Sequence, residues 1–367
     1  MKYLGGMNTT SPFLEPFIAG LETLWAYVAA HVVFCLIPAF FIAGAIAALV
    51  KKDVILQYFG SDVKPWLSYS IASISGTILA VCSCTILPIF MGLYKKGAGI
   101  GPATAFLFSG PAINVLAIVY TAQLLGWGLG LARAVSAILL SVVIGGAMAF
   151  IFRKEEKTLR KQKKKTKLTS GLGTSEETKP HWVILLFFSF LVAILVIGTT
   201  TIAIWIRLSI IYILTIGLFV LILRYFNKDE LTDWGYETWD LTKKIFPILL
   251  AGAFFVGFIA YFLPPETFRP YLGGNSLMSC FVASILGGFL YMPTLLEVPI
   301  VGTTLGYSSG VMGGGPALSL LLSGPAVSLP SILVLYRLIG AKKAAAYILL
   351  VIMTATIAGF IYGQIIG

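Results

Sequence analysis

The chain has 367 residues, of which 58% are hydrophobic and only 11% are charged, and its mean hydropathy is +0.94. A soluble globular domain carries about 25% charged residues, so this composition excludes an ordinary soluble protein. The formal net charge is +11, but nine of the 26 Lys and Arg residues fall within residues 153–167, without the interleaved aromatic residues that stack on bases. We therefore expect an all-α polytopic membrane protein and no nucleic-acid partner.

The chain opens on sixteen residues that lack the charged and apolar regions of a signal peptide, so no cleaved leader is expected. Residues 21–50 then form an apolar stretch long enough to cross a hydrocarbon core of about 30 Å. Lys51 and Lys52 follow it. Because Lys and Arg concentrate in cytoplasmic loops, this loop is expected inside and the amino terminus outside.

The next apolar segment, residues 65–94, is predicted to be a re-entrant hairpin. Lys64 precedes it, and Lys95 and Lys96 follow it. Both ends lie inside only if the segment enters the membrane and returns on the same side. Gly76 and the stretch that starts at residue 82, Cys-Ser-Cys followed by Pro88, supply the interruption that such a turn needs.

The Cys-Ser-Cys stretch, Cys82, Ser83 and Cys84, is a candidate substrate site. Residues i and i+2 point about 200° apart on a regular helix, so the two thiols face one cavity only if the helix is unwound there. Thiolates bind soft partners such as trivalent arsenic, copper(I) and zinc. The alternative is that both cysteines are small packing residues.

A second break is predicted within residues 101–115, "GPATAFLFSGPAINV". Ser109, Gly110 and Pro111 are expected to unwind the helix, and Asn114 follows them. Backbone N–H groups freed at such a break favour polar or anionic ligands. Close packing of helices through small residues is the alternative.

A basic loop and a hairpin separate the two apolar halves. Residues 153–181 are predicted to form a cytoplasmic loop whose basic run, 153–167, contacts anionic lipid head groups. Apolar helices at about 182–204 and 208–226 then return the chain to the cytoplasm at Lys228.

Glu297 stands out in the carboxyl-terminal half, in "YMPTLLEVPIVG". It precedes Pro299 within residues 276–305, which would form a second re-entrant hairpin from the opposite face. A carboxylate in a membrane segment indicates function by default, and burial favours its protonated form, as a proton-coupled exchanger requires. A structural hydrogen bond is the alternative. Arg133 either extends to the interface or pairs with Glu297.

The two halves are related in sequence. Residues 315–329, "GPALSLLLSGPAVSL", match residues 101–115 at eight of fifteen positions. Ser323, Gly324, Pro325 and Ser328 therefore correspond to the first break. The resulting division is a repeat at 20–152, a basic loop at 153–181, a central hairpin and linker at 182–244, and a second repeat at 245–367.

Lysine placement makes the second repeat start inside and the first start outside, which defines an inverted-topology repeat. The expected fold has about eight full spans and two re-entrant hairpins, with both termini outside the cell membrane. The four breaks, at residues 82–88, 109–114, 292–299 and 323–328, are expected to converge on one site.

Residues 82–126, "CSCTILPIFMGLYKKGAGIGPATAFLFSGPAINVLAIVYTAQLLG", resemble the predicted-permease family that includes the ArsP organoarsenical efflux permeases. The carboxyl-terminal half from Glu297 onward is also similar to that family. This resemblance implies a cytoplasmic-membrane permease, and for characterised members it implies export of trivalent organoarsenicals. It would make Cys82 and Cys84 the ligand pair.

The sequence thus predicts a secondary permease for a small soft solute, working by alternating access. Glu297 and Arg133 are the candidates for coupling, and no cofactor, metal site or enzymatic activity is expected. A permease for a small sulfur-containing or other anion is one alternative, and a membrane thiol enzyme is another. The sequence leaves the oligomeric state open.

Overall fold

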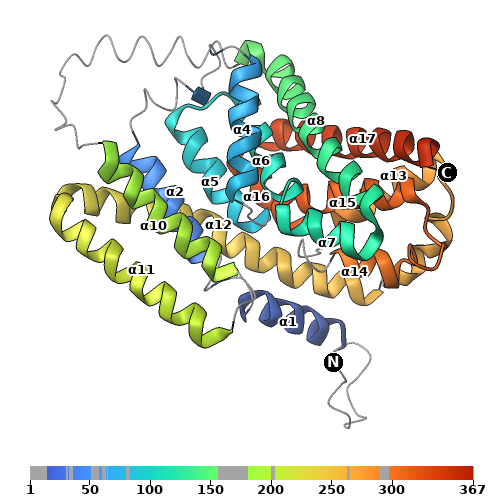
Figure 1. Ribbon diagram of the computed structural model, residues 1–367, viewed down its shortest axis with the longest axis horizontal. Helices are drawn as coiled ribbons and strands as arrows, with labels where there is room; N and C mark the ends of the chain where they lie inside the picture. The colour runs from blue at the N-terminus through green and yellow to red at the C-terminus, as the bar shows by residue number, and fades with distance from the viewer. Residues whose placement is uncertain are drawn as a thin grey trace, which may run out of the picture.

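The computed structural model describes residues 15–29, 32, 36–50, 58–59, 63, 65–79, 83–155, 181–199, 203–262, 265–289 and 297–366. Within these ranges the secondary structure is helical and contains no strand (Figure 1). The elements up to the basic loop are α1 (Glu15–Tyr27), α2 (Ile37–Leu49), α4 (Pro65–Leu79), α5 (Ser83–Lys96), α6 (Ile100–Ala112), α7 (Val115–Leu125) and α8 (Trp127–Ile151). Those beyond it are α10 (His181–Thr199), α11 (Ile204–Tyr225), α12 (Lys228–Phe262), the 3₁₀ helix η2 (Pro265–Tyr271), α13 (Leu277–Phe289), α14 (Glu297–Pro299), the π-helix η3 (Ile300–Thr304), α15 (Gly314–Ala326), α16 (Leu329–Ile339) and α17 (Ala341–Ile366).

Four of the described helices are long and apolar enough to cross a membrane: α8, α11, α12 and α17. Two bent pairs raise this number to six if each pair is one span: α6 with α7, bent by 44°, and α15 with α16, bent by 48°. The architecture is therefore that of a multi-pass membrane protein with four to six apolar spans. The eight full spans that the sequence predicts are not confirmed.

The first apolar stretch is described only in part. Residues 21–50 were expected to form one span, and the structure describes most of α1 and all of α2 within them, two helices of 13 residues each. Residues 30–31 and 33–35, between these helices, lie outside the described residues. Pro38 lies in the first turn of α2, where proline is tolerated.

Matched helices in the two halves have matched lengths. Helices α6 and α15 each have 13 residues, and α7 and α16 each have 11. The long helices α8 and α17 have 25 and 26 residues. Each long helix follows a glycine with positive φ, Gly126 at 104° and Gly340 at 85°. The sequence repeat is thus also a repeat of helix lengths and of the turns between helices.

The repeated helices pack in the same way. Helix α6 packs on α4 and α8, and α15 packs on α13 and α17 (Figure 1). A Cβ on Gly101 of α6 would come within 2.9 Å of the Gly145 carbonyl oxygen on α8. A Cβ on Gly315 of α15 would come within 2.8 Å of the Gly359 carbonyl oxygen on α17. Small residues at helix crossings permit such close backbone approach.

The long helices α8 and α17 run antiparallel. Lys343, near the start of α17, forms a 2.7 Å ion pair with Glu155, which follows α8. At the opposite ends, a Cβ on Gly128 at the start of α8 would lie 3.5 Å from the hydroxyl of Tyr362 near the end of α17. This one pair of corresponding helices therefore points in opposite directions.

Charged side chains gather where α5 ends and α12 and α17 begin. Lys95 of α5 pairs with Glu237 and Asp240 of α12 at 2.9 and 2.7 Å. Lys343 donates a hydrogen bond to the Tyr94 hydroxyl at 3.3 Å. Lys95, whose position predicts a cytoplasmic location, therefore lies at the same end of the molecule as Lys343.

Candidate functional site

The centre of the candidate site is an ion pair between the two halves. Arg133 of α8 and Glu297 at the start of α14 are both fully buried. Arg133 Nη2 donates to Glu297 Oε2 at 3.2 Å. From the sequence, a pairing of Arg133 with Glu297 was one of two alternatives. In the structure the two side chains form this ion pair.

The arginine is held by a second contact within its own half. Arg133 Nη1 donates to Thr121 Oγ1 of α7 at 3.0 Å. Thr121 in turn donates to the Ala117 carbonyl oxygen at 2.6 Å, so its hydroxyl accepts from the guanidinium in a fixed orientation. The Nε of Arg133 has no hydrogen-bond partner among the described residues.

The carboxylate of Glu297 is held against a glycine. A Cβ on Gly324 of α15 would lie 2.5 Å from Glu297 Oε1. Only glycine leaves room for the carboxylate at this position, because real Cβ atoms do not approach so closely. Within the described part of the chain, Oε1 has no hydrogen-bond partner.

Such an arrangement is electrostatically demanding. Removing two charges from water costs several kcal/mol per ion, and a buried pair offsets this only when its remaining hydrogen-bonding capacity is satisfied. Here Glu297 Oε1 and Arg133 Nε have no hydrogen-bond partner among the described residues. Unsatisfied buried polar atoms are rare in native proteins and call for a specific explanation, such as a bound proton, ion or ligand.

The Cys-Ser-Cys stretch lies at a helix start. Helix α4 ends at Leu79 and α5 begins at Ser83. Residues 80–82, Cys82 among them, lie outside the described residues. Ser83 and Cys84 belong to the first turn of α5, although the description does not extend to their side chains.

Pro88 does not lie at this break. The break was predicted to extend over residues 82–88, but α5 continues through Pro88, which is buried. Proline removes only its own N–H bond and crowds the carbonyl of residue i−4, which is Cys84 in the first turn. The helix therefore tolerates Pro88 near its start, and residues 83–88 of the predicted break are helical.

The serine-glycine-proline triads also differ in detail from the prediction. Ser109, Gly110 and Pro111 were expected to be unwound, but they form the last turn of α6. The N–H of Ile113 still donates to the Ser109 carbonyl oxygen at 2.9 Å, and the bend follows at Asn114. Asn114 is nearly buried, with 7% of its surface exposed.

The second triad repeats this geometry. Ser323, Gly324 and Pro325 lie in the last turn of α15, where the Val327 N–H donates to the Ser323 carbonyl oxygen at 2.9 Å. Ser328 follows at the bend and is buried. Both helices therefore bend two or three residues after the proline rather than at the triad itself.

The serine hydroxyls of the triads have local roles in this structure. Ser109 Oγ donates to the Ala72 carbonyl oxygen of α4 at 3.3 Å and to Phe106 of its own helix at 3.2 Å. Ser323 Oγ donates to the Leu320 carbonyl oxygen of its own helix at 3.4 Å, and Ser328, which follows the second triad, has its Oγ 2.8 Å from Ser331 Oγ. Gly324 of the second triad lies against the carboxylate of Glu297. Pro299 belongs to the same three-residue helix, α14, as Glu297.

Comparison with known proteins gives the family. The chain matches the family model ArsP_1, described as a predicted permease, over residues 18–364. The chain belongs to this family. It is 40% identical to UPF0718 protein MJ0584 of Methanocaldococcus jannaschii over 358 residues, 94% of this chain and 95% of that protein. UPF0718 protein YraQ of Escherichia coli is 23% identical over 298 residues, 81% of this chain and 67% of that protein. No solved structure was found to match.

One contribution to the site of this family member is not evident from its sequence. Thr121 is one hydroxyl in an apolar helix, and only its place opposite Arg133 marks it.

Proposed function

We propose that this protein is a secondary permease that moves a small soft solute by alternating access between two inverted halves. The observation that carries the proposal is the buried ion pair between Arg133 of one half and Glu297 of the other. An ionised pair deep in a membrane protein marks a substrate or ion path by default. The pair also lies between the elements that would have to move relative to one another.

The antiparallel course of α8 and α17 supports an inverted repeat. A re-entrant course of the α4–α5 segment is supported by where its ends lie. The Tyr69 hydroxyl of α4 donates to the Gly145 carbonyl oxygen near the end of α8, at 3.5 Å. Tyr94 of α5 reaches the same end of α8 through Lys343 and Glu155.

The corresponding segment of the second half has both ends near residues 272–273. Ser279 in the first turn of α13 donates to the Gly273 carbonyl oxygen at 3.1 Å. The loop after η3 returns to this point, where the Gly313 N–H donates to the Leu272 carbonyl oxygen at 3.1 Å. These contacts favour a second re-entrant hairpin that enters from the opposite face.

Glu297 is proposed as the proton carrier. When it is ionised, its charge pairs with Arg133 and ties the halves together. When it is protonated, the ion-pair attraction to Arg133 is removed and only a hydrogen bond from the charged guanidinium to a neutral carboxyl group remains. Taking up a proton from one side would thus weaken the contact between the halves, and releasing it to the other would restore that contact.

Cys82 and Cys84 are proposed as the substrate ligands, for a trivalent organoarsenical. Two thiols displace two hydroxyl groups of methylarsenite, forming two As–S bonds and releasing two water molecules, with no change in oxidation state. The start of α5 at Ser83 supports this choice, because backbone N–H groups at a helix start favour negative charge such as that of a thiolate.

The test is accumulation of trivalent methylarsenite in inside-out membrane vesicles. Intact protein would be compared with Cys82→Ser, Cys84→Ser and the double variant. Accumulation that requires both thiols is the expected result. Absence of accumulation by verified, folded protein would contradict the arsenical substrate, and the same vesicles would then be assayed with small sulfur-containing anions. Chemical conversion of the substrate without net movement would favour a membrane thiol enzyme.

The sidedness follows from the lysines. We place the 153–181 loop and the charged end of the molecule in the cytoplasm, and both termini outside the cell membrane. Positive charge in short loops marks the cytoplasmic side, which supports this orientation. Contact of the 153–167 run with anionic head groups is part of the same proposal, although residues 156–180 lie outside the described part of the chain.

A further inference from the structure

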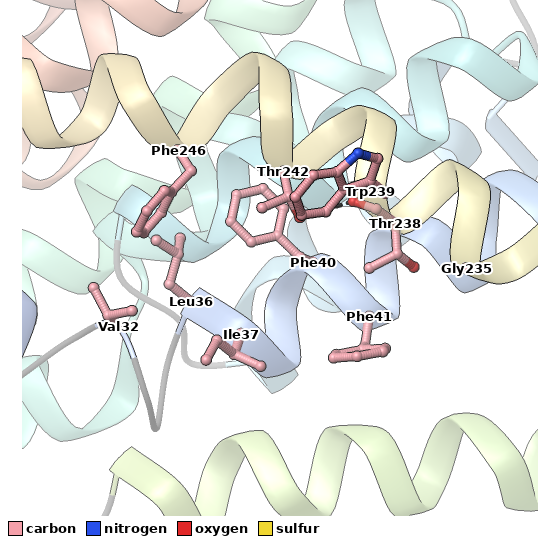
Figure 2. A pocket seen from close by; sticks show the side chains of 10 residues that line it. All are labelled: Val32, Leu36, Ile37, Phe40, Phe41, Gly235, Thr238, Trp239, Thr242 and Phe246. Carbon is pink, nitrogen blue, oxygen red and sulfur yellow. Dashed lines mark hydrogen bonds between the residues drawn. The ribbon is translucent and has the colours of Figure 1, made fainter.

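A cavity of about 400 Å³ lies between α2 and α12, away from the Arg133–Glu297 pair. Figure 2 shows Phe40 of α2 directed toward α12, whose Trp239 and Phe246 also line the cavity. The volume is within the usual range for small-molecule pockets. Such pockets orient polar ligands with a few placed polar groups, but this wall is almost entirely hydrocarbon. Its chemistry suits an alkyl chain.

The cavity lies where α12 changes character. The first half of this 35-residue helix is rich in charged residues up to Lys244, and the remainder, from Ile245 to Phe262, is apolar. Trp239, which lines the cavity, is 66% exposed. Exposed tryptophan is enriched at the membrane–water interface. The cavity therefore lies at the depth where a lipid acyl chain meets its head group.

A lysine borders the cavity on the same helix. Lys243 is four residues after Trp239 and three before Phe246, spacings that make neighbours on a helix surface. It is exposed and makes no ion pair with any residue that the structure describes. The adjacent Lys244, by contrast, is 2.8 Å from Asp240. An apolar cavity with one available cation at its border is complementary to an anionic lipid.

We propose that this cavity binds one acyl chain of an anionic phospholipid, with Lys243 contacting the phosphate. A groove of similar size between α8 and α17, about 440 Å³, provides an internal comparison. Its wall is also apolar, and no exposed Lys or Arg lies within four residues of its lining residues along α8 or α17, whereas Lys243 borders the α2–α12 cavity. Lipid chains contact both surfaces, whereas selectivity for anionic head groups belongs to the α2–α12 cavity alone.

The experiment is a titration followed by native mass spectrometry of the full chain released from detergent. The probes are dioleoyl phosphatidylglycerol and dioleoyl phosphatidylcholine, which share the same acyl chains. One lysine near a membrane surface contributes about 1 kcal/mol toward an anionic lipid, which corresponds to about fivefold in affinity. We expect one phosphatidylglycerol to bind about fivefold more tightly than phosphatidylcholine.

Two pairs of variants assign that binding to the cavity. Gly235 lines the cavity, and a Cβ there would meet nothing within 4 Å, so Gly235→Leu fills the space without a clash. Gly146 of α8 is equally open and lies outside the cavity, which makes Gly146→Leu the matched control. Lys243→Gln removes the bordering charge, and Lys228→Gln removes an exposed lysine at the far end of the charged half of α12.

The proposal predicts that Gly235→Leu weakens binding of both lipids and that Lys243→Gln abolishes the fivefold preference, while both controls behave as the unmodified protein. Equal binding of the two lipids by the unmodified protein would overturn it. So would an unchanged preference in Lys243→Gln, or displacement of the lipid by inorganic phosphate, which would point to a free anion as the occupant.

Discussion

Arg133 and Glu297 meet where neither has access to water, and each depends on the other to remain charged. The sequence pointed to Glu297 because a carboxylate within an apolar segment is costly, and it named Arg133 as one candidate partner. It gave no indication of Thr121, because a single hydroxyl in an apolar helix is common. It named Gly324 for its place in a repeat, whereas the structure shows that Gly324 provides the space for the carboxylate.

Breaking the pair should destabilise the fold. Glu297→Leu leaves a buried guanidinium without its counter-charge and should lower the free energy of unfolding by about 3–5 kcal/mol. Combining it with Arg133→Met removes both charges and should recover most of that loss. Denaturant titration in mixed micelles measures both values. A double variant no more stable than Glu297→Leu would contradict direct coupling between the two side chains.

Gly324 should tolerate no side chain. Gly324→Ala places a methyl group 2.5 Å from Glu297 Oε1 and should cost about 1–3 kcal/mol through overpacking. Gly288→Ala is the matched control, because its Cβ would lie at ordinary contact distance, 3.7 Å from Val327. Thermal unfolding in detergent ranks the two variants. Equal stability of the two would mean that the carboxylate is not confined by Gly324.

At the scale of elements, the bends depend on local backbone chemistry. The sequence located both breaks, through the serine-glycine-proline triads, but placed the unwinding two or three residues too early. Proline constrains the turn before it, and the helix closes that turn before it bends, as the Ile113 and Val327 hydrogen bonds show. The first break was predicted to extend over residues 82–88 because the sequence alone cannot distinguish a proline in a first turn from one at a break.

The turns into α8 and α17 should require glycine. Gly126 has φ 104° and ψ 150°, and Gly340 has φ 85° and ψ 159°. Only glycine adopts this region readily, so Gly126→Ala and Gly340→Ala should each cost about 1–3 kcal/mol although neither Cβ would meet a neighbour. Gly146→Ala, in the interior of α8, should instead be neutral or stabilising by up to about 1 kcal/mol. Unfolding midpoints that do not separate these variants would contradict a strained backbone at the two turns.

At the scale of the whole molecule, the repeat was readable because residues 101–115 and 315–329 share eight of fifteen positions. The number of spans was not readable, since apolar length does not reveal where a span bends, as between α6 and α7 or between α15 and α16. The pairing of Lys95 with α12 and of Lys343 with Glu155 depends on helix packing, which no local pattern encodes.

The proposed orientation predicts opposite accessibility for the two ends of the molecule. In a background without the four native cysteines, Gln364→Cys should react with an impermeant thiol reagent in intact cells. Lys154→Cys and Lys228→Cys should react only in inside-out vesicles. Labelling of Gln364→Cys and Lys154→Cys from the same side would contradict the inverted arrangement of α8 and α17.

The central claim is that Glu297 couples proton movement to transport between the two halves. Its most direct test is methylarsenite accumulation in inside-out vesicles with an acidic interior, comparing the unmodified protein with Glu297→Gln. The account predicts accumulation that collapses with the pH gradient, and none above background for a folded Glu297→Gln variant. Gradient-driven accumulation by Glu297→Gln at the unmodified rate would contradict it.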